Sequence, residues 1–439
     1  MKMKKIIALL VAAMMAGGLV ACGGGDADEK GGGTEGDLNW SAGADDSGGE
    51  VTLRVATWRK YDKEYYEEII RRFQEKYDWI TVELEINADS GSYYSNLQAD
   101  LIGGTAPDVF DHHPNSNIVV YAKEGMIAPQ TDFEYMKNYK ENAKEITTFL
   151  GENYGFMNAY NYFGCLYNID IFNEVGVSVP TTPDELIEVV DKLKAAGYGG
   201  ISFAGATNGA GGVANPVFLE SLGTENYAKF QEGIDNGSIT DISTVEGVPE
   251  ALDTLQAYTE HDTWYTAVQG ISYEASVSLY AQKKAAILYG GSYILGEGVH
   301  FPDIKTGYFP LPVYGKTGVT YAEGAQTTLI NAAGKNLGAA KLWVEFLASP
   351  EIAEFYCTNT EMMSTIEGVE VETDNLTMLR NSCQNYVIGT IVEQENSEYW
   401  SGGFNELLRG VVFEDKDWKD LVKIYTNKLE DYDLSRLSN

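Results

Sequence analysis

The chain has 439 residues, with 31 Lys or Arg against 65 Asp or Glu, and a formal net charge of −34 at pH 7. So acidic a chain lacks the basic surface with which nucleic-acid binders release counterions, which excludes most of that class. Hydrophobic residues at 44% and charged residues at 22% exclude a wholly disordered chain, and the length predicts two or three domains or one two-lobed body.

The first 22 residues have the organisation of a bacterial export signal. Lysines near the start precede an uncharged apolar run over 6–20, which is too short for a comfortable permanent bilayer anchor. The run ends in Leu19-Val20-Ala21-Cys22, which resembles the lipobox of bacterial lipoproteins. That resemblance implies a signal peptide over 1–21, a lipid on Cys22, and a location at the cell surface, on the outer face of the bacterial cytoplasmic membrane. The alternative is a buried cysteine that happens to follow small residues.

Residues 22–50 are mostly Gly, Ser, Asp and Glu. Such a segment cannot bury enough apolar surface to offset its ordering entropy, so we expect a flexible tether between Cys22 and the folded part. No later stretch approaches about 18 consecutive apolar residues, the length at which a membrane-spanning helix would be predicted.

Strand alternation and helical spacing follow one another from Val51 onward. Strands are predicted over 51–58, 80–86 and 107–110, with helices over 65–77 and 94–101 between them. A βαβαβ order implies a parallel sheet with right-handed crossovers.

Further along, Thr182 can cap a helix over 184–196, with Pro183 in its first turn. The remaining pattern predicts a segment over 200–204 between glycine-rich turns, helices over 216–222, 249–260, 276–283, 337–347, 351–356 and 418–429, and a strand over 285–289. No short-period repeat is visible, and two α/β lobes fit this succession best.

Several local patterns suggest chemistry only weakly. Gly315-Lys316-Thr317 lacks the first glycine and the preceding strand of a phosphate loop. The glycine-dense segment 205–212 lacks dinucleotide spacing and is predicted to be a flexible loop. Adjacent histidines on an extended chain point apart, so we expect no metal at His112-His113 and no cofactor elsewhere. The sequence singles out no carboxylate pair for glycosidase catalysis.

The cysteines after the lipobox form neither a zinc pair nor a disulfide framework. Cys165, Cys357 and Cys383 are predicted to be small buried hydrophobes, although a bridge between Cys357 and Cys383 stays open.

Three segments close together carry a family resemblance: Tyr154-Gly155-Phe156, then 164–172 and 176–186. In this order they closely resemble the central signature of family 1 extracellular solute-binding proteins, the sugar-type receptors of ABC importers. Supporting matches lie at 104–109, 121–126, 284–287, 291–293, 309–312 and 339–350. The resemblance covers essentially everything from Val51 onward.

The resemblance implies an α/β, periplasmic-binding-protein-like fold of type II, in which two hinged lobes close on a central ligand cleft. It places the lobe crossings near 159–163, 311–312 and 358–364, so that one lobe holds 51–160 with 313–360 and the other holds 161–312 with 361–439. It also implies a monomeric binding protein, not an enzyme, whose partner is an ABC transporter permease.

Sugars present apolar ring faces edged by hydroxyls, so their sites combine aromatic platforms with side chains that donate and accept hydrogen bonds. The loops expected at the cleft carry that combination in Trp58, Arg59, Tyr61, Asp111, His112, His113, Asn115, Tyr160, Asn161, Tyr162, Asn208 and Asn215. By resemblance, Tyr293 takes the position of the family's stacking Trp, and Tyr399, Trp400 and Phe404 take that of a further stacking segment. For each residue the alternative is core packing or plain exposure.

Few arginines lie in these loops, which disfavours strongly anionic ligands and favours a neutral sugar or oligosaccharide. Two other functions stay open. One is an extracellular glycan-active enzyme. The other is a binding protein for a polyamine or peptide, since Asp108 and Asp111 would suit a cation.

Overall fold

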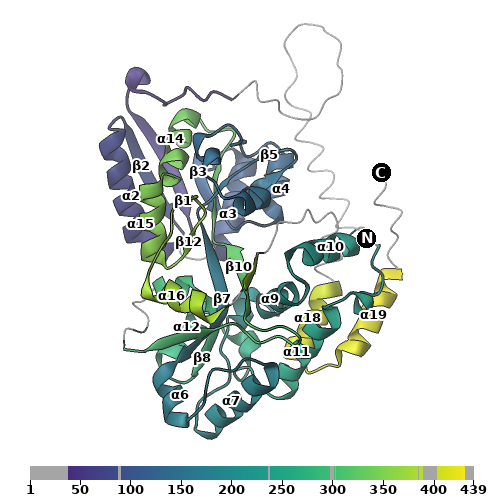
Figure 1. The fold of residues 1–439 in the computed structure, drawn as a ribbon. Helices are drawn as coiled ribbons and strands as arrows, with labels where there is room; N and C mark the ends of the chain where they lie inside the picture. Colours follow the sequence, from purple (N-terminus) through teal and green to yellow (C-terminus); the bar gives the residue numbers. More distant parts are fainter. Residues whose placement is uncertain are drawn as a thin grey trace. The chain divides into compact units, whose positions relative to one another are not determined.

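The computed structural model describes residues 38–87, 90–235, 238–296, 301, 303–383, 385–388 and 403–430 (Figure 1). The predicted signal peptide, Cys22 and the first part of the predicted tether lie outside these residues, as do Tyr399 and Trp400. Within the described ranges, no helix has both the length and the apolar character that crossing a bilayer requires.

The first sheet has the strand order β2-β1-β3-β11-β6. Its strands are β1 (Val51–Thr57), β2 (Ile80–Ile86), β3 (Val109–His112), β6 (Phe156–Met157) and β11 (Thr327–Ile330). β1 pairs in parallel with both β2 and β3, whereas β11 pairs antiparallel with β3 and β6. The helices between the parallel strands are α2 (Lys63–Lys76) and α3 (Ser90–Gly103). The predicted βαβαβ unit is confirmed.

The second sheet is built around β7 (Ala159–Asn168), a strand of ten residues. Its path is β12-β7-β10-β13, and β8 and β9 also pair with β7. The other strands are β8 (Ile287–Gly291), β9 (Thr306–Phe309), β10 (Val319–Gly324), β12 (Met363–Ser364) and β13 (Asn385–Ile388). β10 runs antiparallel to β7 and parallel to β13.

Helices α14 (Leu337–Leu347) and α15 (Pro350–Thr360) lie beside α2 against the first sheet (Figure 1). Trp343 of α14 is fully buried and meets Phe73 of α2 edge-on, with ring centroids 5.1 Å apart. The smaller elements of this part are α4 (Ser116–Lys123), η4 (Glu134–Lys137), α5 (Glu141–Thr147), β4 (Thr148–Phe149), β5 (Glu152–Asn153) and η3 (Lys60–Asp62).

Most other helices pack around the second sheet. α7 (Pro183–Ala195) begins as predicted, because the Thr182 hydroxyl accepts a hydrogen bond from Glu185 N at 3.3 Å and Pro183 stands in the first turn. The others are α6 (Ile169–Val175), α8 (Gly205–Asn208), α9 (Gly211–Leu222), α10 (Thr224–Asp235), η5 (Ile242–Thr244), α11 (Val248–Glu260), η6 (Val268–Gly270), α12 (Tyr273–Ala281), α13 (Tyr293–Gly296), α16 (Asp374–Ser382), α18 (Asn405–Phe413) and α19 (Trp418–Glu430).

The glycine-dense segment 205–212 is not the flexible loop that the sequence predicts. It contains α8 and the start of α9, joined by Gly209 and Ala210, and Gly209 takes a left-handed backbone angle (φ 63°). Glycines at Gly205 and Gly212 allow the close packing, since a Cβ at Gly205 would lie 2.3 Å from the Val268 carbonyl oxygen.

The packed part of the chain begins earlier than predicted, at Leu38 rather than Val51. Trp40 meets Phe133 edge-on at 5.3 Å, and the Trp79 indole donates to the Gly43 carbonyl at 3.3 Å. Gly338 N, in the first turn of α14, donates to the Ala42 carbonyl at 2.8 Å. The segment ends in the short η2 (Asp46–Gly48). One aromatic contact, the indole hydrogen bond and the satisfied helix donors offset the cost in conformational entropy of ordering this polar segment.

The chain changes from one sheet to the other where short links join their strands. β6 ends at Met157 in the first sheet and β7 begins at Ala159 in the second, while β10 ends at Gly324 and β11 begins at Thr327. α15 likewise leads into β12 at Met363. The limits of the two lobes given above, 51–160 with 313–360 and 161–312 with 361–439, stay a prediction.

Cys165, Cys357 and Cys383 are free. Cys165 and Cys357 are fully buried, as predicted, and Cys383 is half-buried at the end of α16. The Cys357–Cys383 bridge that the sequence left open is therefore not formed.

Candidate ligand-binding cleft

Two adjoining cavities lie between the loops of the first sheet and the elements of the second. One has a volume of about 260 Å³ and the other about 920 Å³. Both are lined by His113, Phe163, Asn208 and Glu323, so they adjoin, and we call the two together the cleft. Such a junction between sheets is where ligand sites of α/β proteins are commonly found.

The floor of the cleft is formed by β7 and β10. Their antiparallel register places Asn161 opposite Glu323 and Phe163 opposite Tyr321. Side chains alternate along a strand, so these four share one face of the sheet, and all four line the cleft. The Tyr321 hydroxyl donates to the Glu323 carboxylate at 2.8 Å. The Oδ1 atom of Asn161, which is only 2% exposed, has no hydrogen-bond partner among the described residues.

The same alternation turns Tyr160 and Tyr162 to the opposite face of the sheet. The Tyr160 hydroxyl donates to Asn142 Oδ1 at 2.6 Å, and the Tyr162 ring lies 5.6 Å from that of Tyr386. Both are buried and neither lines the cleft. Of the predicted hinge triplet only Asn161 faces the cavity. The period of two over 159–168 could have indicated this from the sequence, and would also have indicated Phe163.

Aromatic rings stand on both walls of the cleft. On the first wall Trp58, at the end of β1, lies 4.7 Å from the His113 ring, and Tyr61 stands nearby. On the second wall the Tyr273 and Tyr293 rings lie 6.0 Å apart. Tyr273, at the start of α12, was not among the predicted residues. Rings on two facing walls offer the flat apolar surfaces that stack on a sugar ring.

Polar side chains on the cleft margin come from α8, α9 and the loop after β3. Asn208 and Asn215 are exposed and line the larger cavity, together with Asn115. Asn115 also caps α4, because its Oδ1 accepts from Asn117 N at 3.0 Å. These three predicted residues are thus placed at the cleft.

The cations of the smaller cavity are paired with carboxylates. Arg59 forms an ion pair with Asp62, and both side chains are at most 10% exposed. Lys60 Nζ lies 3.4 Å from the Glu274 carboxylate, so this pair joins η3 on one wall to α12 on the other. Hydrogen bonds from its own backbone N–H and from Lys60 hold the pKa of Glu274 below its usual value. The walls therefore present balanced charge.

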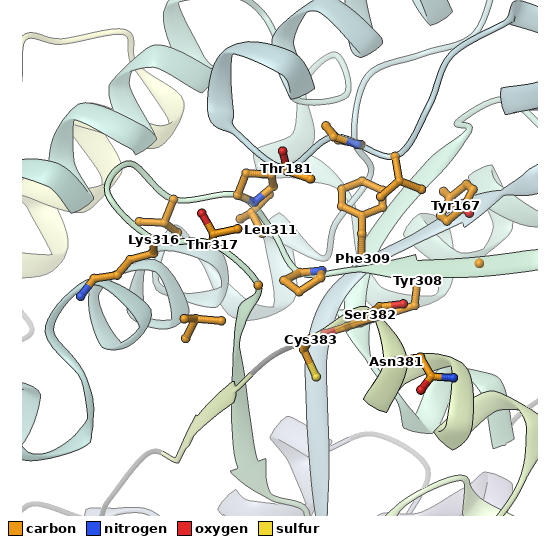
Figure 2. A pocket seen from close by; sticks show the side chains of 18 of the residues that line it. Tyr167, Thr181, Tyr308, Phe309, Leu311, Lys316, Thr317, Asn381, Ser382 and Cys383 are labelled. Atoms are coloured by element: carbon orange, nitrogen blue, oxygen red, sulfur yellow. The ribbon is translucent and has the colours of Figure 1, made fainter.

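A separate cavity of about 420 Å³ lies beside β9, the 310–318 loop and the end of α16 (Figure 2). Its lining includes Phe309, Leu311, Lys316 and Cys383, and it shares no residue with the cleft cavities. Glu220 of α9 also lines it. The Glu220 side chain is 2% exposed and accepts a hydrogen bond from Tyr321 N at 2.8 Å. Burial raises the pKa of Glu220 well above its usual value, which favours the neutral acid.

Other predicted residues are buried away from the cleft. Asp111 and His112 are at most 2% exposed, and His112 packs against the Tyr94 ring at 4.6 Å. Burial lowers the pKa of His112 to about 4 and that of His113 to about 3, so both imidazoles are neutral at pH 7. Of the two, His113 alone lines the cleft. No group of His, Cys, Asp and Glu suited to a metal ion occurs among the described residues.

Phe404, predicted as a stacking residue, lies in the hydrophobic core that packs on the second sheet, with 1% exposure. Its ring meets Phe218 edge-on at 5.4 Å. Its neighbours in that prediction, Tyr399 and Trp400, lie outside the described residues.

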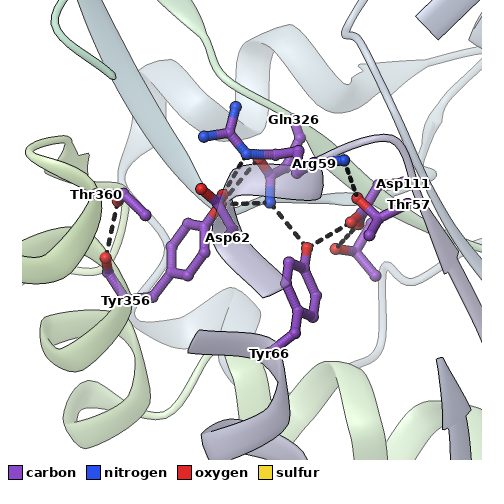
Figure 3. A network of polar contacts seen from close by, with 9 residues as sticks. Thr57, Arg59, Asp62, Tyr66, Asp111, Gln326, Tyr356 and Thr360 are labelled. Atoms are coloured by element: carbon purple, nitrogen blue, oxygen red, sulfur yellow. Dashed lines mark hydrogen bonds and ion pairs between the residues drawn. The ribbon is translucent and has the colours of Figure 1, made fainter. Parts of the chain in front are cut away.

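A buried polar network fixes the first wall from behind (Figure 3). Asp62, which pairs with Arg59, accepts a hydrogen bond from the Tyr356 hydroxyl of α15 at 2.7 Å. Gln326 Nε2 donates to the hydroxyls of Tyr356 at 2.9 Å and of Tyr66 at 3.0 Å. The Tyr66 hydroxyl in turn donates to Asp111 at 2.5 Å. Asp111 therefore supports the wall at a distance and does not line the cavity.

Comparison with known proteins identifies the family. The sequence profile of bacterial extracellular solute-binding proteins matches residues 56–354. The multiple sugar-binding protein of Streptococcus mutans serotype c is 23% identical over 349 residues, covering 77% of this chain and 81% of that protein.

Solved structures extend the likeness to the fold. RafE of Streptococcus pneumoniae in complex with raffinose has a TM-score of 0.70 at 21% identity, covering 87% of this chain and 99% of the other. A substrate-binding protein of Listeria monocytogenes in complex with cycloalternan has a TM-score of 0.69 at 19% identity, covering 87% and 98%. The predicted two-lobed, periplasmic-binding-protein-like α/β fold is confirmed.

Proposed function

The chain belongs to the family of bacterial extracellular solute-binding proteins, and from that premise we propose that its cleft captures a neutral sugar or oligosaccharide and delivers it unaltered to an ABC importer. The relatives named above support this choice of cargo, since their names refer to multiple sugars, raffinose and cycloalternan.

One observation carries the proposal: aromatic rings stand on both walls of a cleft whose Arg and Lys are already paired. Trp58 on one wall and Tyr293 on the other line the same cavity, which the side chains of Asn161 and Asn208 also line. Stacking faces with amide donors and acceptors match the faces and hydroxyls of a sugar. Paired cations leave little to attract an anionic ligand.

We further propose that a lipid on Cys22 holds the protein on the outer face of the cytoplasmic membrane, where it acts as a monomer beside an ABC transporter permease. The residue pattern at the N-terminus supports the anchor. Replacing Cys22 with Ser should release the protein into the medium, which fractionation of cells carrying either form would measure.

A thermal-shift screen against neutral mono- and oligosaccharides tests the cargo. A ligand at 100 times its Kd stabilises the folded protein by about 2.7 kcal/mol, enough for a clear rise in Tm. Calorimetry of each hit at low and high salt follows, and stacking-driven binding should change little with salt. Affinity for a polyamine that collapses with salt would favour the cationic cargo instead. Appearance of a shortened glycan during incubation would favour the enzyme.

Trp58→Ala sharpens this test. Loss of the indole should weaken binding of the best sugar by about 2 kcal/mol or more, roughly 30-fold in Kd, because the ring is a central platform. Tyr386→Ala is the matched control, since that ring is 48% exposed on β13 and contacts Tyr162 on the face turned away from the cleft. If Trp58→Ala binds the sugar as tightly as Tyr386→Ala does, the sugar does not stack on Trp58.

A further inference from the structure

The floor of the cleft offers hydrogen-bond acceptors that lack donors. Asn161 Oδ1 is buried without a partner among the described residues, and Glu323 stands directly opposite it on β10. The Tyr321 hydroxyl donates one hydrogen bond to Glu323. A carboxylate can accept about four hydrogen bonds, so most of its capacity is open toward the cavity. Both cavities that make up the cleft reach this carboxylate.

The charges around Glu323 are already engaged elsewhere. On the walls, Arg59 pairs with Asp62 and Lys60 pairs with Glu274. Arg409 of α18, which lines the larger cavity, lies 3.1 Å from Glu414. Within the described part of the chain, no cation stands within ion-pair distance of Glu323.

The remaining titratable neighbours hold one charge state around neutral pH. Burial lowers the pKa of His113 to about 3, so its ring stays neutral. Burial also raises the pKa values of the phenols that face Glu323 from α3, β8 and β10, namely Tyr94, Tyr289 and Tyr321. Glu323 is thus the group at this floor whose charge changes near neutrality.

We propose that Glu323, together with Asn161, is the specificity-determining pair of the cleft, and that the ionised Glu323 carboxylate accepts hydrogen bonds from two adjacent hydroxyls of the bound sugar. This inference rests on the proposed function and deepens it. Hydroxyls supply the donors that the floor lacks, and a charged acceptor makes the shorter and stronger bond. A cargo with adjacent free hydroxyls is therefore selected over one in which either hydroxyl is blocked as an ether.

Affinity should consequently depend on pH. Burial raises the pKa of Glu323 to about 7, against the opposing hydrogen bond from Tyr321. A cargo that binds the ionised form lowers that pKa, so binding is tightest above pH 7 and weakens as pH falls through it. Each unit by which the cargo lowers the pKa corresponds to about a tenfold change in affinity.

The experiment is calorimetry from pH 5.5 to 8.5 with raffinose as first probe, followed by the sugar that gives the largest thermal shift. For the unsubstituted protein we expect affinity to rise about tenfold or more across this range. Glu323→Gln keeps size and one acceptor oxygen but loses the charge. It should bind roughly tenfold more weakly at pH 8.5 and show a flat profile. Tyr321→Phe removes the hydrogen bond that favours ionisation, so its profile should shift to higher pH.

Glu220→Gln is the matched control, because Glu220 also accepts a hydrogen bond from Tyr321 but lines the separate cavity. It should keep both the affinity and the pH profile. A flat profile for the unsubstituted protein, tighter binding on acidification, or equal affinity of Glu323→Gln at pH 8.5 would overturn the proposal. Should Glu323→Gln fail to fold, the proposal is tested by Tyr321→Phe, and an unshifted pH profile of that variant would overturn it. If no sugar binds at any pH, the proposed function itself has failed.

Discussion

The cleft and the separate cavity each contain a glutamate bound to the same tyrosine. Tyr321 donates through its hydroxyl to Glu323 in the cleft and through its backbone N–H to Glu220 in the separate cavity. Glu323 is half-buried, and its pKa is raised to about 7. Glu220 is 2% exposed, and burial raises its pKa well above the usual value.

This difference shows that a buried acid alone does not identify a ligand site. Both glutamates have perturbed pKa values and both line a cavity, yet the surroundings differ. The cleft brings rings and amides from both sheets to one space, whereas Glu220 lies between a helix and the β10 backbone. We therefore expect Glu323 to govern binding and Glu220 to govern stability.

The largest stability effect is expected at Glu220. Glu220→Ala leaves Tyr321 N buried without an acceptor and should cost about 1–3 kcal/mol of unfolding free energy. Glu220→Gln keeps an acceptor oxygen and should be close to neutral at pH 4.

The pH dependence at Glu220 has a definite sign. The folded-state pKa is raised above the unfolded value of about 4.3, so the group's contribution is fully present below that pH. It is lost as pH rises toward the folded pKa. Denaturant unfolding at pH 4 and pH 8 should therefore show Glu220→Gln gaining stability relative to the unsubstituted protein at the higher pH. A constant difference would mean that folding does not shift the pKa of Glu220.

A smaller effect is expected from the ion pair across the cleft. Lys60 and Glu274 are 32% and 59% exposed, and such pairs contribute about 0.2–1 kcal/mol. Lys60→Ala should weaken sugar binding by about 1.4- to fivefold in low salt, which is the fold-change that corresponds to this energy, and by less in high salt. Lys63→Ala removes an exposed pair within α2, Lys63 with Glu67, and serves as the control with unchanged affinity. If Lys63→Ala weakened sugar binding more than Lys60→Ala does, the Lys60–Glu274 pair would have no specific effect on the cleft.

The smallest effect on function is expected in the separate cavity. Cys383 is half-buried there, whereas Cys165 and Cys357 are fully buried. Burial raises the pKa of the Cys383 thiol, so a maleimide should label it slowly and faster at higher pH, and ahead of the other two. Mass spectrometry locates the label, and calorimetry should then find sugar affinity unchanged. If labelling of Cys383 lowered the sugar affinity, the separate cavity would influence binding in the cleft.

Local signals in the sequence predicted the elements well. The alternation of 80–86 matches β2, the apolar helix 337–347 matches α14, and Thr182 with Pro183 opens α7. Each of these elements follows from a local property, either the backbone preference of single residues or the spacing of apolar residues along the chain. The segment from Leu38 to Glu50 was misjudged because its order comes from Trp79, Phe133 and α14, which are distant in sequence.

The site was predicted in part, for reasons of geometry. Trp58, His113, Asn161 and Tyr293 line the cleft, because they follow strands or stand on them at the junction of the sheets. Residue types alone did not indicate which side chains of β7 face the cavity, so Tyr160 and Tyr162 were predicted together with Asn161. Glu323 was missed because β10 joins β7 from more than 150 residues away, as the register of Glu323 with Asn161 shows.

The sequence by itself determined where strands and helices form, the acidic character of the chain and the family to which it belongs, since these follow from local periodicity, composition and motif order. Only the tertiary structure decided that Asn161 faces the cleft while Tyr160 and Tyr162 do not, and that Glu323 and Glu220 share one tyrosine in different cavities. The reason is physical: burial, strand pairing and the solvation of a charge depend on neighbours that the linear order of residues does not place together.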